Sequence, residues 1–225
     1  MSVAVHRVVA IDGPAGSGKS TIARGVAEAL GLEVLDTGAM YRAVAAGAIR
    51  AGVDPGDAAA AAAIAERATI SVDHGVTTLD GVDISAEIRG PEVTGVVSVV
   101  AAHPEVRAQL VARQREWVET HGGGVVEGRD IGSVVFPDAA VKVFLTASHE
   151  ERARRRQRDE AAADRDVSVS ALRAAMARRD AADSTRSASP LRTADGATIV
   201  DTTDRLPADV VAEIVEAFRV VEGVE

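Results

Sequence analysis

The fold of this chain is decided by the stretch Val8-Val9-Ala10-Ile11-Asp12-Gly13-Pro14-Ala15-Gly16-Ser17-Gly18-Lys19-Ser20-Thr21. From Gly13 it follows the pattern of a phosphate-binding loop: Gly, four residues, then Gly-Lys-Ser. The apolar residues ahead predict a buried strand, and helical apolar spacing follows it. Such a loop presents backbone N–H groups and a helix dipole to phosphates. We therefore expect the nucleoside triphosphate site at Gly13, Pro14, Ala15, Gly16, Ser17, Gly18, Lys19, Ser20 and Thr21.

Two side chains of this loop carry the expected chemistry. Lys19 is expected to reach the β- and γ-phosphates, and the Ser20 hydroxyl is expected to hold Mg²⁺. The alternative is a glycine-rich turn that matches the pattern by chance. The strand before it and the helix after it argue against that alternative.

The composition limits the classes of protein that fit. The chain has 225 residues, is 47% hydrophobic and has 2% aromatic residues, so Val, Ala, Leu and Ile must build the core of one domain. The absence of cysteine excludes disulfides, thiolate metal sites and a cysteine nucleophile. A net charge of −9 argues against a nucleic-acid partner. No leader pattern and no apolar run of about 20 residues is present, which predicts a cytoplasmic protein without a membrane partner.

Apolar strands alternate with helical patterns, which is typical of an α/β fold with a parallel sheet covered by helices. We expect strands at 8–12, 33–36, 125–127, 141–145 and 198–201. The expected helices are 20–30, 39–51, 104–119, 149–158, 170–180 and 207–221, with a further one over the alanine run at 58–63.

Two stretches interrupt the alternation. Segments 69–73 and 76–80 are expected to be small strands joined at His74-Gly75, forming an antiparallel insert outside the main sheet. The polar and charged stretch 157–169 is expected to be a mobile cover on the surface.

Three groups of polar residues follow predicted strands or share a helix face. Thr37, Tyr41 and Arg42 follow the second strand, where Thr37 could simply cap a helix and Arg42 could bind a second phosphate. Arg129 and Asp130 follow the third strand, as a structural pair or as ligand contacts. The last group is Arg179, Asp183 and Arg186, whose spacing fits either a salt-bridge ladder or a site for phosphate and ribose. Phosphoryl transfer needs gathered positive charge of this kind.

Together these motifs resemble the bacterial cytidylate kinases, within the P-loop nucleoside monophosphate kinases, over nearly the whole chain. The resemblance implies a three-layer α/β/α fold with a five-stranded parallel sheet in a single domain. Its core would cover 1–60, 100–150 and 190–225, its nucleotide-binding insert about 61–99, and its lid about 151–170. The implied reaction moves a phosphoryl group from ATP to CMP or dCMP with Mg²⁺. We expect a monomer, because no exposed apolar stripe in the sequence is left unassigned.

The resemblance also implies residue roles. Lys19, Arg129, Arg179 and Arg186 would be catalytic. Around the CMP phosphate would lie Thr37, Arg42, Arg129 and Arg186, while Arg179 and Asp183 would face the ribose. Tyr41 is also expected in the CMP site, close to the phosphate. Ser98, Arg107 and Asp130 would read cytosine, and Arg152, Arg155 and Arg156 would close from the lid onto ATP. Glu127 stands where the family has an aspartate, which leaves its role toward Mg²⁺ open.

Two alternatives belong to other classes of acceptor or function. One is a P-loop kinase for another small acceptor, such as UMP, AMP or shikimate. The other is a GTP-dependent switch, but the chain has no asparagine and so lacks the guanine-reading Asn-Lys-x-Asp motif. The five histidines are scattered without metal-ligand spacing, and Trp117 is expected in the core.

Overall fold

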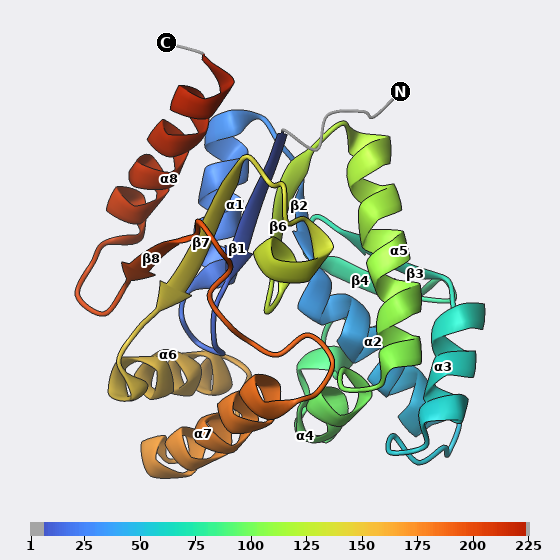
Figure 1. The fold of residues 1–225 in the computed structure, drawn as a ribbon. Helices are drawn as coiled ribbons and strands as arrows, with labels where there is room; N and C mark the ends of the chain where they lie inside the picture. Colours follow the sequence, from blue (N-terminus) through green and yellow to red (C-terminus); the bar gives the residue numbers. More distant parts are fainter. Residues whose placement is uncertain (1–6, 224–225) are drawn as a thin grey trace.

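A five-stranded parallel sheet forms the centre of the computed structural model, which describes residues 7–223. The strands lie in the order β2-β6-β1-β7-β8 (Figure 1). Their bounds are β1 Val8–Asp12, β2 Val34–Asp36, β6 Gly124–Gly128, β7 Val141–Thr146 and β8 Thr198–Asp201. β1 and β6 are buried along their whole length, as expected for central strands of a parallel sheet. All five predicted strands are confirmed.

Helices cover both faces of the sheet. Their bounds are α1 Lys19–Leu30, α2 Thr37–Arg50, α3 Ala58–Arg67, α4 Pro91–Val100, α5 Pro104–His121, α6 His149–Ala162, α7 Val169–Thr185 and α8 Pro207–Glu222. One hydrophobic cluster joins α1 and α8 to one face, through residues such as Val26 and Phe218. A second cluster joins α2 and α5 to the other face, through residues such as Val44 and Leu110. The three-layer α/β/α prediction is therefore confirmed.

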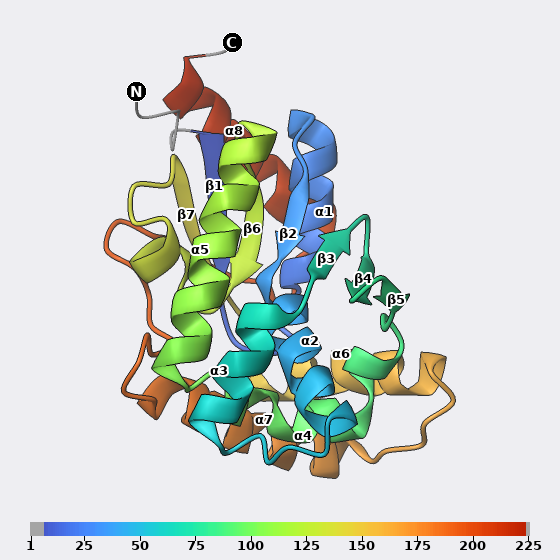
Figure 2. The same ribbon diagram turned by 90° about the vertical axis from the view of Figure 1, so that its right-hand side faces the viewer.

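The antiparallel insert stands outside the main sheet (Figure 2). β3 (Ile70–Asp73) pairs with β4 (Val76–Leu79) across the turn at His74-Gly75, as predicted. A third strand, β5 (Val82–Asp83), pairs with β4 after a second tight turn. This third strand was not predicted, because two residues carry too little periodicity to be recognised.

Two differences between expectation and structure concern helices. α4 was not predicted, because its run of valines and Gly95 has low helix propensity. Its buried Val93, Val97 and Val100 recur at helical spacing, and their packing outweighs that propensity. The segment 157–169, expected to be a mobile cover, is helical as far as Ala162, and the predicted lid boundary at 170 falls inside α7.

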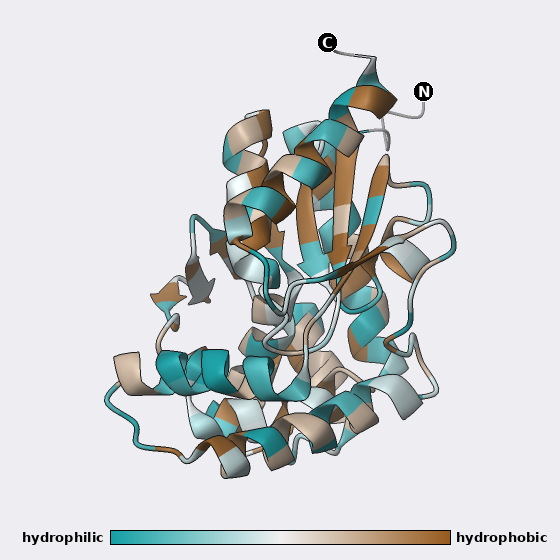
Figure 3. Cartoon of the chain, turned by 90° about the vertical axis from the view of Figure 1, so that its left-hand side faces the viewer, coloured by the Kyte–Doolittle hydropathy of each residue, from teal (hydrophilic) through white to brown (hydrophobic). Residues whose placement is uncertain are grey.

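The hydropathy of the residues follows the layers of the fold. Figure 3 shows apolar strands at the centre and a strongly hydrophilic α6 at the outside of the molecule. In the described residues, every helix is too short or too polar to cross a membrane.

Candidate active site

The candidate site lies where the parallel strands of the sheet end. Asp12, Asp36 and Gly128 come together at this edge because β1, β2 and β6 run in parallel and in register. The phosphate-binding loop leaves β1 here and enters α1. The helices α6 and α7 lie across the same edge (Figure 1). In α/β sheets, the space beyond the carboxyl ends of the strands is where ligands bind.

The loop needs its glycines for two separate reasons. Gly16 and Gly18 have φ angles of 75° and 93°, which L side chains rarely adopt. At Gly13, an added Cβ would lie 2.1 Å from the Leu145 carbonyl oxygen, so the loop packs directly on β7. The Lys19 side chain is buried beside this loop, and its amine donates to the Pro14 carbonyl oxygen at 2.9 Å. Burial and the nearby Arg129 lower the pKa of Lys19.

Ser20 and Glu127 form the part of the site suited to a cation. The Ser20 hydroxyl donates to the Glu127 carboxylate at 3.0 Å. Glu127 is buried at the end of β6, and burial together with the nearby Asp36 raises its pKa. Hydroxyl and carboxylate oxygens are ligands that Mg²⁺ accepts.

Thr37 does not cap α2, which corrects one of the two roles considered for it. The Asp36 carboxylate caps the helix by accepting from the Ala39 N–H at 3.1 Å. The Thr37 hydroxyl donates to the Glu127 carbonyl oxygen at 2.7 Å. Thr37 thus joins the start of α2 to the end of β6, beside the proposed cation ligands.

Asp12 belongs to the site but was not predicted. Its carboxylate accepts from the Ile131 and Gly132 N–H groups, both at 2.8 Å. These bonds hold the turn that follows β6, and with it Arg129 and Asp130. Burial raises the pKa of Asp12 to about 6, although the two backbone bonds act against that rise. The signal in the sequence was an acidic residue at the end of a fully apolar strand.

Arginines gather beside the phosphate-binding loop. Arg129 donates to Asp183 at 3.0 Å, and Arg179 approaches the same carboxylate at 4.0 Å. Burial and the nearby Arg129 and Arg42 lower the pKa of Arg179 to about 9. Burial, with Arg156 close by, also lowers the pKa of Arg42 to about 10. These guanidinium groups repel one another, so an anion placed among them would be strongly favoured.

A second polar cluster lies beside the arginines. Arg107 and Asp130 form a buried ion pair, and Arg186 lies 3.6 Å from the other oxygen of Asp130. The Arg107 guanidinium rests on the Tyr41 ring, 5.4 Å from its centroid. Burial raises the pKa of Asp130, while Arg107 and Arg186 favour its charged form. The expected grouping of Arg107 with Asp130 is therefore present in the structure.

Ser98 and Arg42 lie in the site with contacts that the sequence did not indicate. The Ser98 hydroxyl donates to Asp183 at 3.1 Å, rather than lying on Asp130 with Arg107. Arg42 donates to the Ile88 carbonyl oxygen at 2.7 Å and to the Thr94 hydroxyl at 2.9 Å. Arg42 therefore ties α2 to the segment that follows the small sheet.

The three expected lid arginines differ from one another. Arg152 is buried and donates to the Ala15 carbonyl oxygen at 3.1 Å and to Asp180 at 2.5 Å. It is thus an anchor of α6 on the phosphate-binding loop, not an arm free to close. Arg155 donates to the Thr202 hydroxyl at 2.9 Å, and Arg156 pairs with Glu160 at 2.5 Å.

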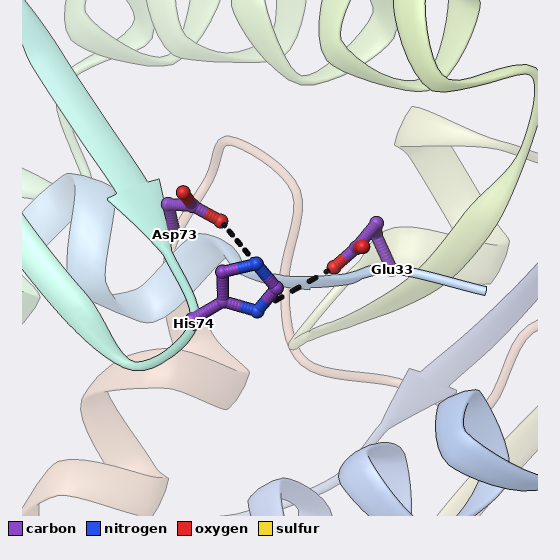
Figure 4. Close-up of side chains that lie close together, drawn as sticks. All are labelled: Glu33, Asp73 and His74. Carbon is purple, nitrogen blue, oxygen red and sulfur yellow. Dashed lines mark ion pairs between the residues drawn. The ribbon is translucent and has the colours of Figure 1, made fainter. Parts of the chain in front are cut away.

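One histidine lies close to two carboxylates, which the spacing of histidines and acidic residues in the sequence did not indicate. His74 lies between Asp73 and Glu33, with nitrogen–oxygen distances of 3.5 and 3.8 Å (Figure 4). All three side chains are exposed. Glu33 precedes β2 and so lies at the opposite edge of the sheet from the phosphate-binding loop. This group is not part of the candidate site.

Trp117, which was expected in the core, is partly buried and packs against the hydrophobic cluster that contains Leu110.

Comparison with known proteins agrees with this geometry. The family model described as "Cytidylate kinase" matches residues 9–220. The chain belongs to the cytidylate kinase family. It is 50% identical to a cytidylate kinase of Mycobacterium avium over 94% of this chain and 95% of that one. It is 52% identical to a cytidylate kinase of Corynebacterium glutamicum, over 88% and 87% of the two chains.

The solved structures agree with the fold. A gluconokinase from Sinorhizobium meliloti superposes with a TM-score of 0.50 at 15% identity, covering 96% of this chain and 94% of that one. At this identity the likeness supports the α/β architecture alone. The family membership rests on the sequence matches, and it agrees with the site at the sheet edge.

Proposed function

We propose that this member of the cytidylate kinase family transfers the γ-phosphoryl group of ATP to CMP or dCMP, which gives ADP and CDP or dCDP. The observation that carries the proposal is the cluster of buried arginines beside a phosphate-binding loop. Burial and mutual repulsion lower the pKa values of Arg42 and Arg179. Two bound phosphate groups would relieve that repulsion, one from the donor and one from the acceptor.

The donor side of the reaction is assigned to the loop between β1 and α1. Backbone N–H groups from Gly13 to Thr21 would surround the ATP phosphates at the N-terminus of α1. The Lys19 amine would leave the Pro14 carbonyl and bind the β- and γ-phosphates. Because the transferred group passes through a loose transition state, positioning and charge stabilisation supply most of the catalysis.

The acceptor side is assigned to the arginines and to the second polar cluster. Arg42, Arg129 and Arg186 would bind the CMP phosphate, with Thr37 and Tyr41 close by. Arg179 and Asp183 would bind the ribose hydroxyls. Asp130, held by Arg107, would accept from the cytosine amino group. Uracil has no such donor, so with UMP the buried carboxylate of Asp130 would lack this hydrogen bond.

Mg²⁺ fits the residues present at the loop. Ser20 and Glu127 already share a hydrogen bond of 3.0 Å, and Glu127 is a buried carboxylate with a raised pKa. We propose that Ser20 ligates Mg²⁺ and that Glu127 orients it, directly or through water. The bound ion would neutralise charge on the β- and γ-phosphate oxygens. A cation bound nearby would act against the burial that raises the pKa of Glu127.

Each segment of the chain is assigned a part in this reaction. We assign the segment 61–99 to acceptor binding, 151–170 to a lid, and the remainder to the core. Arg155 and Arg156 are the lid arginines proposed to approach ATP. We further propose that the enzyme acts as a monomer in the cytoplasm, which holds its nucleotide substrates.

The test is ADP release by the purified protein with Mg²⁺–ATP and a panel of acceptors. The panel contains CMP, dCMP, UMP, AMP, GMP, dTMP and shikimate. We expect fast release with CMP and dCMP only. Fast release with another acceptor would keep the kinase and overturn the roles of Ser98, Arg107 and Asp130. Slow hydrolysis without dependence on any acceptor would overturn the proposed reaction.

A further inference from the structure

Gln114 is a buried amide to which the proposed reaction gives no role. It lies on α5, two turns after Arg107, and its exposed fraction is 1%. Within residues 7–223, neither its Nε2 nor its Oε1 atom has a hydrogen-bond partner. A buried polar group left without a partner costs about 1–3 kcal/mol. An apolar side chain of the same shape would be more stable here, so the amide indicates a functional requirement.

The Tyr41 hydroxyl is the polar group that faces this amide. Burial raises the pKa of Tyr41 to about 12, and the Gln114 side chain is close enough to act in the opposite sense. Yet the two groups do not complete a hydrogen bond of normal length and angle, and the hydroxyl is itself buried and unpaired. The Tyr41 hydroxyl oxygen is thus an unused acceptor that faces the N–H donors of the amide.

Tyr41 connects Gln114 to the residues proposed to bind the base. The Arg107 guanidinium rests on the Tyr41 ring, and Arg107 pairs with Asp130. The next residue on α2, Arg42, is bonded to the Ile88 carbonyl and the Thr94 hydroxyl. A small movement of α2 with the acceptor-binding segment would therefore change the distance between Tyr41 and Gln114.

We propose that Gln114 is a positioning residue for the acceptor base. When the acceptor nucleotide binds, the Nε2–H of Gln114 donates a hydrogen bond to the Tyr41 hydroxyl oxygen, which fixes the ring that supports Arg107 beside Asp130. Gln114 acts through Tyr41 and does not touch the substrate. The inference rests on the proposed function, because the base concerned is the cytosine of CMP.

The test replaces the amide by an apolar side chain of similar length. For Gln114→Met we expect the KM for CMP to rise about fivefold, with the KM for ATP changed less than twofold. We also expect an unchanged or higher melting temperature, since an unpaired buried amide is removed. Tyr41→Phe should raise the KM for CMP to a similar extent. The double variant should be no worse than either single one, because both remove the same interaction.

Gln109→Met is the matched control, since Gln109 is exposed on the same helix. It should leave both KM values and the melting temperature as they are. A lower melting temperature for Gln114→Met, failure of that variant to fold, or an equal rise in the KM for ATP would show a structural role and overturn the inference. Additive effects of Gln114→Met and Tyr41→Phe would also overturn it.

The two proposals fail in different ways. If the wild-type enzyme phosphorylates CMP and Gln114→Met has the same KM for CMP, the inference alone is wrong. If the wild-type enzyme does not phosphorylate CMP, the proposed function is wrong and the inference falls with it.

Discussion

At the residue scale, the site is a set of buried charges held in place by backbone groups. Asp12 is fixed by two N–H groups, and Lys19 is fixed by a carbonyl oxygen. Arg107 and Asp130 form an ion pair in which each side chain is only 5% exposed. Each of these residues costs free energy to bury, so their arrangement is more easily explained by ligand binding than by stability.

Asp130 gives the most direct test of base recognition. Asp130→Ala removes the acceptor for the cytosine amino group, and we expect the ratio of kcat/KM for CMP over UMP to fall at least about tenfold. The measurement is ADP release with each acceptor. Asp138→Ala, at an exposed position on the same stretch, should keep the wild-type ratio. An unchanged ratio in Asp130→Ala would remove Asp130 from base recognition.

Asp12 should make the stability of the fold depend on pH. Its pKa rises from 3.8 to about 6 on folding, so its contribution is complete below pH 3.8 and is lost as the pH rises through 6. Asn cannot ionise. The unfolding free energy of the wild type minus that of Asp12→Asn should therefore fall by about 2 kcal/mol between pH 4 and 7. Urea unfolding at several pH values measures this difference, and a difference independent of pH would contradict it.

At the element scale, the lid helices are attached to the phosphate-binding loop more firmly than their composition suggests. The sequence of α6 is almost entirely polar, which is typical of a solvated helix. The structure buries Arg152 of this helix between the Ala15 carbonyl and Asp180. A buried arginine cannot be distinguished from its exposed neighbours by sequence pattern, because all of them lie in one run of like charge.

Arg152→Ala tests this attachment. It leaves Asp180 without its partner in a mostly buried position, and we expect the unfolding free energy to fall by about 3 kcal/mol. The KM for ATP should rise as well, because the Ala15 carbonyl loses its donor. Arg154→Ala is the control: its pair with Glu150 is exposed, so about 0.5 kcal/mol or less is expected. Equal effects of the two substitutions would contradict the anchoring role.

At the scale of the whole molecule, the sheet separates two hydrophobic clusters with different neighbours. The cluster with Leu110 includes residues of the acceptor-binding segment, such as Leu79 and Val97. The cluster with Phe218 lies between α1, α8 and the sheet, and within the described residues it contains none from that segment. We expect damage in the second cluster to change stability without changing acceptor binding.

Phe218→Ala tests this separation. Phe218 is 3% exposed and belongs to the C-terminal part of α8. Figure 1 shows that this end of α8 lies away from the edge of the sheet that holds the site. The substitution should lower the unfolding free energy by about 3 kcal/mol or more. The KM for CMP, measured below the new melting temperature, should change less than twofold. Val221→Ala, in an exposed position on the same helix, should change neither quantity.

The sequence predicted the main elements of the fold because their patterns are local. The strand, glycine loop and helix at residues 8–30 could be recognised from periodicity and one motif. α4 could not, because its stability depends on packing against other helices. In the site, Arg107 and Asp130 were grouped correctly through the family resemblance. Gln114 was missed, since a glutamine among helix-forming residues carries no signal until its burial is known.

The buried amine of the phosphate-binding loop has a consequence for chemical labelling. The chain has only two lysines, Lys19 and Lys142. Reductive methylation with ¹³C-formaldehyde should therefore label Lys142 and the terminal amine quickly and the buried Lys19 slowly. With so few resonances, NMR could follow the appearance of the Lys19 signal alone, and a nucleotide that covers this amine should slow its labelling further.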